Sequence, residues 1–313
     1  MKKLITNILI SFLLMTVTLS LVWIAPGTYP HDLAALVNKK EMLKSKKSPR
    51  LIFIGGSSQI CLKSPLIEKE LGYSVANMSL FGGLGTMEYL EEIKPYLGPG
   101  DVVVVTMEYA TVLSNQYYQY IHTNEEAKKA FFLMSPERHS LEYIKNREFG
   151  DLFKTIFLLS QIKVRSYIRN LTTANFAHLF DNGFPNYAQE YNANGDRFAP
   201  FITFRPLGGN MDFNYPEMSH LAFLNDFSEF ASKRNAKIVI YFSHFPEAQF
   251  RANKNYINAY YDLAIKSFKF PILNKPSDFM FPEKYFADTI YHLTEEGEKI
   301  RSAELIRMLK KIL

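Results

Sequence analysis

A serine directly after a short apolar run is the first candidate for chemistry in this chain. Residues 50–61 read RLIFIGGSSQIC, so the apolar run Leu51–Ile54 is followed by Gly55, Gly56 and then Ser57. Such a run is typical of a buried strand of a parallel sheet, which packs apolar side chains on both faces, and the glycines permit a tight turn that a Cβ atom would obstruct. We therefore expect Ser57 at the carboxyl end of a strand, where open α/β sheets bind ligands. It is a candidate nucleophile; a purely structural or phosphate-binding turn is the alternative.

An aspartate and a histidine near the carboxyl terminus could complete such a site. Asp288 precedes His292 in a loop that leads into the last predicted helix, and Thr294 is a suitable N-cap for that helix. A serine nucleophile needs an imidazole as general base and a carboxylate that holds the imidazole tautomer and stabilises the imidazolium. Asp288 and His292 can supply both groups, although an Asp–His pair at this spacing is also common on protein surfaces.

Alternating strands and helices must bring these residues together. After the first strand we predict a helix at Ser64–Leu71, a strand at Tyr73–Met78, a helix at Thr86–Lys94 and a strand at Asp101–Met107. The alternation resumes late in the chain, with helices at His220–Arg234, Tyr256–Phe268 and Thr294–Leu313 and strands at Lys237–Phe242 and Phe270–Leu273. Five strands that alternate with helices predict an α/β fold with a three-layer, parallel, five-stranded sheet.

The middle of the chain breaks this alternation. Helical patterns occur at Asn124–Met134, Ser140–Asn146 and Asp151–Arg169, whereas residues 175–214 are rich in Asn, Gly, Pro and aromatic residues. A long irregular stretch is uncommon in a compact fold unless it is functional. We predict one domain over residues 50–313 with a helical and loop insertion at 109–216. The insertion either covers the active edge of the sheet or packs a small core of its own.

The amino terminus predicts a membrane anchor. Residues Leu4–Ala25 carry no charged side chain, and about 20 such residues in a helix span a bilayer core. The apolar region is longer than the ~7–15 residues of a cleavable signal peptide, and Trp23 suits the membrane interface. We predict an uncleaved, single-pass transmembrane signal anchor over residues 1–25 and a linker over 26–49. Because the chain starts with Met-Lys-Lys, the globular part is expected outside the cytoplasm.

Composition excludes several other classes of function. The chain has 313 residues and a net charge of only +5, with no basic block interleaved with aromatics, so no nucleic-acid partner is predicted. Cys61 is the single cysteine, which excludes an internal disulfide and a cysteine-rich metal site. His122, His139 and His178 lack metal-ligand spacing, so we predict no metal and no cofactor. His244 follows the fourth predicted strand, where a packed or solvated histidine is favoured over one that faces the site.

Polar residues after the second and third predicted strands join the candidate set. Asn77 and Gly82 lie at the end of the second strand, and Glu108 and Tyr109 follow the third. Asn77, Glu108 and Tyr109 are possible substrate-site residues. With the glycine–serine turn and the late Asp–His pair, this ordered set resembles the SGNH (GDSL-like) hydrolase superfamily. The GSS sequence, the leading anchor and a late HLxxxG particularly resemble its membrane-anchored extracytoplasmic branch, which includes teichoic-acid D-alanylation and polysaccharide O-acetylation proteins.

The resemblance implies a fold, a role for each motif and an activity. It implies a flavodoxin-like sheet, with Ser57 as nucleophile, His292 as base and Asp288 as acid. It also implies an oxyanion hole built on Gly82 and the N–H of Ser57. The activity implied is acyl transfer through an acyl-serine intermediate, as an O-acyltransferase or a carbohydrate esterase.

Three departures from the family pattern limit the resemblance. Glu108 stands roughly where the family has an Asn, and an ionised carboxylate only accepts hydrogen bonds, so it cannot stabilise an oxyanion. Gly56 stands where the common pattern has an Asp. Three residues rather than two separate Asp288 from His292, which leaves Asp278 as an alternative acid.

The anchor and the family branch favour a cell-envelope substrate. The resemblance covers about residues 51–107 and 237–313 and leaves the insertion unmatched. We expect the acceptor to be a cell-surface or secreted polysaccharide, and a transferase would need a membrane-bound O-acyltransferase partner to supply the acyl group outside the cell. The alternative is a catalytically inactive assembly or binding protein of the envelope that keeps the fold.

Overall fold

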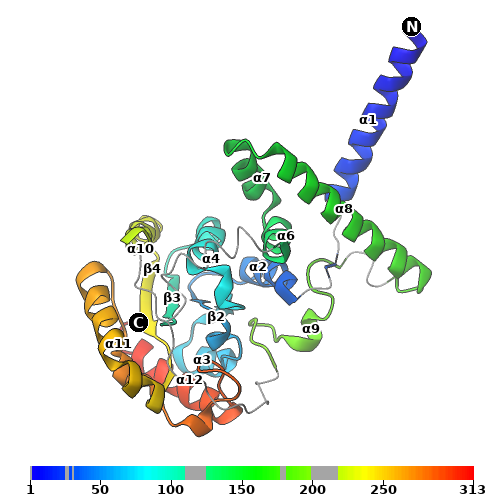
Figure 1. Cartoon of the computed structure of the whole chain (residues 1–313). Coiled ribbons are helices and arrows are strands. Elements are labelled where there is room, and N and C mark those ends of the chain that lie inside the picture. Colours follow the sequence, from blue (N-terminus) through cyan, green and yellow to red (C-terminus); the bar gives the residue numbers. More distant parts are fainter. Residues whose placement is uncertain (1, 25–27, 30–31, 110–124, 177–180, 199–217) are drawn as a thin grey trace. The chain divides into compact units, whose positions relative to one another are not determined.

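A computed structural model describes residues 2–24, 28–29, 32–109, 125–176, 181–198 and 218–313 of the chain (Figure 1). The chain forms two compact units. We call Met1–Asn38 with Lys128–Tyr187 the helical unit, and Lys39–Ala127 with Ala188–Leu313 the sheet unit. Every described residue of the predicted active site belongs to the sheet unit.

The sheet unit is an α/β fold around a parallel sheet, as predicted. Its four strands are β1 (Arg50–Ile54), β2 (Ser74–Asn77), β3 (Val102–Met107) and β4 (Lys237–Phe242), in the order β2-β1-β3-β4. Every residue of β1 and β3 is buried, because central parallel strands are covered on both faces. In register, Phe53 of β1 lies between Asn77 and Val104, so the loops after these strands leave the same edge of the sheet.

The predicted fifth strand does not form among the described residues. Beyond β4, Ile272 makes only an isolated parallel bridge with Ile240. Pro271 has no N–H to donate to a ladder, and the Asn274 side chain then replaces the backbone as partner of β4. It accepts from the Phe242 N–H at 2.7 Å and donates to the Phe242 carbonyl at 3.1 Å. The segment occupies the fifth position of the sheet without continuing as a strand.

Helices on both faces of the sheet complete three layers. They are α3 (Ser64–Leu71), α4 (Thr86–Ile93), α10 (Met218–Ser232), α11 (Glu247–Ser267) and α12 (Glu295–Leu309). One core cluster joins strand residues such as Phe53 and Val104 to Ile67 of α3 and Leu305 of α12. On the other face, α4 packs against β1, α10 against β4, and the two helices against each other. A separate pair of short parallel strands, β5 (Phe245–Pro246) and β6 (Met280–Phe281), was not predicted.

The helical unit has a small core of its own. Besides α1 (Lys2–Ile24), it contains α7 (Pro136–Lys145), α8 (Phe149–Thr172) and most of α6 (Glu125–Met134). Its core cluster is Phe132, Leu152 and Leu159. The predicted insertion 109–216 was expected either to cover the active edge of the sheet or to pack a core of its own, and its helices do pack such a core. Residues 110–124 and 199–217 lie outside the described part.

The structure bears on the predicted linker, whereas it leaves the predicted anchor open. Residues 26–49 contain α2 (Ala35–Ser45), in which Leu36 and Leu43 are fully buried, so much of this segment is packed rather than extended. Among the described residues, no helix is both long and apolar enough to span a bilayer. The anchor at residues 1–25 stays a prediction.

A buried ion pair closes the amino-terminal edge of the sheet. Arg50, the first residue of β1, donates to Asp101 at 2.6 Å, and both side chains are almost fully buried. Nε also donates to Asp101 at 3.3 Å, and the terminal nitrogens donate to the carbonyl groups of Leu43, Lys46 and Tyr96 at 2.7, 3.1 and 2.6 Å. Asp101 also accepts from the N–H groups of Arg50 and Gly98, both at 2.9 Å. The pair is therefore fully hydrogen-bonded, which is the condition under which a buried charge pair is stable.

We expect Asp101→Asn to destabilise the protein by about 3–5 kcal/mol, because it leaves the Arg50 charge buried without a counter-charge. The measurement is urea denaturation followed by circular dichroism. The matched control is Glu304→Gln, which removes an exposed carboxylate 2.8 Å from Arg307 and should change stability by less than about 0.5 kcal/mol. Equal effects of the two substitutions would contradict this account.

Candidate active site

The loop after β1 presents Ser57 because two glycines let it lie against the third strand. A Cβ atom on Gly55 would lie 3.0 Å from Thr106 Oγ1 of β3, and one on Gly56 would lie 2.6 Å from the Glu108 carboxylate. Gly56 has φ −86°, so close approach and not backbone conformation requires glycine there. Ser57 then begins a single 3₁₀ turn, Ser57–Gln59, closed by the bond from the Ile60 N–H to the Ser57 carbonyl at 3.3 Å.

Ser57, His292 and Asp288 form a continuous chain of hydrogen bonds. Ser57 Oγ lies 2.8 Å from His292 Nε2, and His292 Nδ1 lies 2.7 Å from Asp288 Oδ1. Because the carboxylate can only accept, Nδ1 carries the proton of the neutral imidazole and Nε2 is free to accept from the serine hydroxyl. This is the arrangement of a nucleophile, a general base and an orienting acid.

Three residues separate Asp288 from His292, and hydrogen bonds within this loop bring the two side chains together. The Thr289 hydroxyl accepts hydrogen bonds from the N–H groups of Tyr291 and His292 at 3.2 and 3.1 Å, and the Ala287 N–H donates to the His292 carbonyl at 2.8 Å. These bonds fold the chain back so that the Asp288 and His292 side chains meet. The alternative acid, Asp278, accepts from the Lys275 N–H at 2.9 Å and caps the 3₁₀ helix Pro276–Phe279 instead.

The surroundings of His292 favour its neutral form. Burial lowers the pKa of His292 below its usual 6.5, and this effect outweighs the opposite influence of Asp288 and Glu108. The positive charge of Arg197 lowers the pKa further. The imidazole is therefore unprotonated at neutral pH, which is the state a general base requires.

Two backbone N–H groups are available beside the serine. In the described part of the chain, the N–H groups of Ser57 and Gly82 donate to no other protein group. Gly82 begins the 3₁₀ helix Gly82–Leu84, and its Cα lies 2.7 Å from where a Cβ on Gly56 would be. The N–H group of Phe81 is held by the Tyr89 hydroxyl at 3.2 Å, which fixes this loop. Unpaired N–H groups on adjoining loops are what an oxyanion hole needs.

Glu108 lies beside the nucleophile loop and is almost fully buried. Its Oε1 accepts from the Ser58 N–H at 3.2 Å, and both carboxylate oxygens occupy the space that a side chain on Gly56 would need. Glu108 thus supports the turn that carries Ser57. Two of the three departures from the family pattern, Gly56 and Glu108, therefore lie next to each other in the structure.

Two predicted substrate-site residues, Asn77 and Tyr109, are buried and form hydrogen bonds with other protein groups. Asn77 is fully buried; its Nδ2 donates to Gln59 and Asp196 at 2.8 and 2.9 Å, and its Oδ1 accepts from the Ser79 N–H. Tyr109 is also buried, and its hydroxyl donates to the Ser243 carbonyl at 3.3 Å. Burial raises the pKa of Tyr109 well above its usual value. The structure gives neither side chain a polar atom to offer a substrate at Ser57.

Sequence reasoning missed Arg301 and the contact made by His244, whose side chains hold the loops that carry Ser57 and His292. Arg301 of α12 is fully buried and donates to the Ser58 carbonyl and to Glu298, whose pKa burial raises to about 8. His244 is fully buried as well, and its Nε2 donates to the Tyr291 carbonyl at 2.8 Å, next to His292. Of the packed and solvated positions that the sequence favoured for His244, the structure shows the packed one. Arg301 had one signal in the sequence: it lies four residues before the buried Leu305, on the same helix face.

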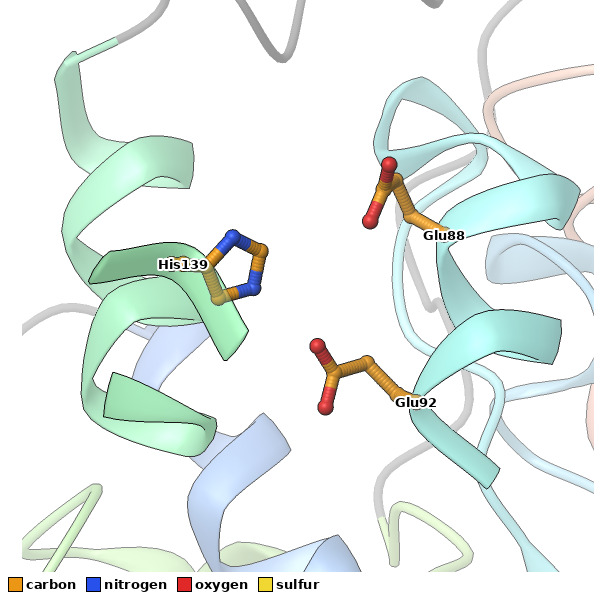
Figure 2. A group of neighbouring side chains, drawn as sticks. All are labelled: Glu88, Glu92 and His139. Atoms are coloured by element: carbon orange, nitrogen blue, oxygen red, sulfur yellow. The ribbon is translucent and has the colours of Figure 1, made fainter. Parts of the chain in front are cut away.

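Three further side chains could bind a metal by residue type. Glu88 and Glu92 lie one turn apart on α4, whereas His139 lies on α7 (Figure 2). Because α4 and α7 belong to different units, these residues do not define a site. His122 and His178 lie outside the described residues. The absence of a metal stays a prediction.

No protein-family model and no curated protein matches this chain. The resemblance to the SGNH superfamily therefore stays a prediction from the motifs, and function has to be argued from the geometry of the site.

We expect Arg301→Met to destabilise the protein by about 3 kcal/mol, because the buried Glu298 and the Ser58 carbonyl both lose their partner. The double substitution Glu298→Met with Arg301→Met should cost less, since it leaves no carboxyl group unpaired. Arg307→Met is the control on the same helix, with an exposed side chain. Thermal and urea denaturation measure all three, and a double variant less stable than Arg301→Met would refute the pairing.

Proposed function

We propose that the sheet unit catalyses serine-dependent acyl transfer on a cell-surface or secreted polysaccharide. The observation that carries the proposal is the Ser57–His292–Asp288 chain of hydrogen bonds, at 2.8 and 2.7 Å. The available N–H groups of Ser57 and Gly82 support it. Such an arrangement suits an O-acyltransferase or an O-acyl esterase of the SGNH type, and it needs no cofactor.

The reaction has two halves that use the same residues. His292 Nε2 takes the proton of Ser57 as Oγ attacks the carbonyl carbon of an ester, and the N–H groups of Ser57 and Gly82 stabilise the resulting oxyanion. When the tetrahedral intermediate collapses, His292 returns the proton to the leaving alcohol and Ser57 keeps the acyl group. A second hydroxyl then gives its proton to His292 and attacks the carbonyl carbon of the acyl-serine. As the bond from that carbon to Ser57 Oγ breaks, His292 returns the proton to Oγ. Water as this hydroxyl makes an esterase, and a sugar makes a transferase.

A surface cavity of about 360 Å³ in the sheet unit, whose lining begins at Leu62 shortly after the turn Ser57–Gln59, supports a glycan acceptor. Its wall combines apolar side chains, which can pack on the face of a sugar ring, with polar ones, which can bind sugar hydroxyls. The lining residues are Leu62, Lys63, Pro65, Leu66, Asn192, Asp196, Arg197, Phe198 and Lys299. An extracytoplasmic, anchored transferase would receive its acyl group from a membrane-bound O-acyltransferase partner.

A second candidate function is a catalytically inactive envelope protein that binds its partners through the same fold. Glu108 is the observation that favours it, because this acidic side chain lies beside the serine where the family has a hydrogen-bond donor. The two candidates differ in one measurable property, which is whether Ser57 becomes acylated.

We expect an acetyl ester or a fluorophosphonate to label the purified full chain on Ser57, as found by mass spectrometry of its peptides. Ser57→Ala should abolish labelling and lower ester turnover by about 10³-fold or more, since the nucleophile is lost. Ser58→Ala, at a buried neighbouring hydroxyl, is the control and should keep the label. A wild-type chain that neither labels nor hydrolyses several esters would favour the inactive protein.

We expect kcat/KM for a soluble ester to rise with pH through a midpoint below 6.5, because only neutral His292 accepts the proton and burial lowers its pKa. Asp288→Asn removes the charge and bond that raise this pKa, so the midpoint should move to lower pH. Its kcat should also fall by about 10³–10⁴-fold because the tautomer is no longer held. Asp278→Asn is the matched control and should change neither value; the reverse result would reassign the acid.

A further inference from the structure

Helix α8 of the helical unit carries a stripe of exposed apolar side chains. These residues recur at intervals of three, four and seven, which places them on one face of a helix. Their exposed fractions range from 40% at Val164 to 71% at Phe153. The stripe consists of Phe149, Phe153, Phe157, Val164, Ile168 and Leu171.

A different face of α8 packs into the core. Leu152 and Leu159 are buried in the cluster with Phe132, and Ser166 is buried as well. Folding of the unit therefore uses the face that bears Leu152 and Leu159 and leaves the stripe outside. A contiguous exposed apolar surface of this kind marks an interaction site for a protein or a membrane.

The charges of α8 suit an anionic surface. The helix carries four basic side chains and one acidic side chain, Asp151. Lys154, Arg165 and Arg169 are exposed, and at helical spacing they lie together beside the stripe. An apolar stripe bordered by basic residues is typical of a helix that lies in the plane of a membrane interface.

Contacts of the chain just after α1 fix where α8 lies. The Thr28 hydroxyl lies 2.6 Å from the Ser166 hydroxyl and accepts from Arg169 at 3.4 Å. Thr28 is four residues beyond Ile24, the last residue of α1, so at most ~14 Å of chain separates the end of α1 from α8. The two helices are in contact, and α8 crosses the end of α1 (Figure 1). A bilayer entered by α1 would thus have α8 at its surface.

We propose that α8 docks on the membrane, with its apolar stripe among the lipid acyl chains and its basic side chains at anionic headgroups. Along its 24 residues the helix offers an edge of about 36 Å, which adds a surface contact to the predicted single anchor. The proposal is independent of the acyl-transfer chemistry. A membrane protein or a second copy of the chain could cover the same stripe, and the experiment distinguishes them.

The test places an environment-sensitive fluorophore on the full chain in vesicles of phosphatidylcholine and phosphatidylglycerol. Phe153→Cys and Ile168→Cys put the label on the stripe, and Asp151→Cys is the matched control on the exposed polar side of α8. The native Cys61 can stay, because it is buried and its thiol pKa is raised to about 12. We expect a blue shift, quenching by nitroxide lipids and loss of quenching by aqueous iodide at 153 and 168, but not at 151.

Three outcomes would overturn the proposal. If iodide quenches the labels at 153 and 168 as strongly as the label at 151, the apolar stripe stays in water. Protection in native membranes but not in vesicles would assign the face to a partner protein. Protection that depends on protein density in the vesicles would assign it to a second copy. Circular dichroism and thermal denaturation show separately that each labelled variant keeps its fold.

Discussion

The contact between Ser57 and His292 is the interaction on which the candidate site depends, and it joins residues 235 positions apart in the chain. A proton can pass between these atoms only while they stay within hydrogen-bond reach. One helix controls both sides of the contact. The N-cap of α12, Thr294, holds the chain just after His292, and Arg301 of the same helix holds the carbonyl of Ser58. Because α12 also packs on the sheet through Leu305, the sheet and the helix together set the distance.

Gly56 and Glu108 are sterically matched to each other. Glycine at 56 leaves a space at the edge of the sheet, and the Glu108 carboxylate fills it from the end of β3. A larger residue at 56 would collide with that carboxylate unless residue 108 became smaller. In the proposed reaction, the donors to the oxyanion are therefore the backbone N–H groups of Ser57 and Gly82.

The buried ion pair and the candidate active site lie at opposite edges of the parallel sheet. The Arg50–Asp101 pair at the amino-terminal edge is buried and has all of its main partners. At the carboxyl-terminal edge, the side chains of Ser57, Asp288 and His292 stay partly exposed. Parallel strands have this asymmetry because every loop that follows a strand leaves the sheet at the same edge.

The sequence by itself determined the parallel α/β sheet, the serine after β1 and the Asp–His pair before the last helix. It could do so because unbroken apolar runs, glycines and a threonine N-cap act over a few residues. Only the tertiary structure decided which polar residues face the serine. Asn77 and Tyr109 form hydrogen bonds with groups far away in the sequence. Arg301 donates to the carbonyl of Ser58, 243 positions away. Asn274 ends the expected fifth strand because its side chain bonds to Phe242. Hydrogen bonds between remote residues leave no local pattern, because each partner is chosen by the packing of the whole unit.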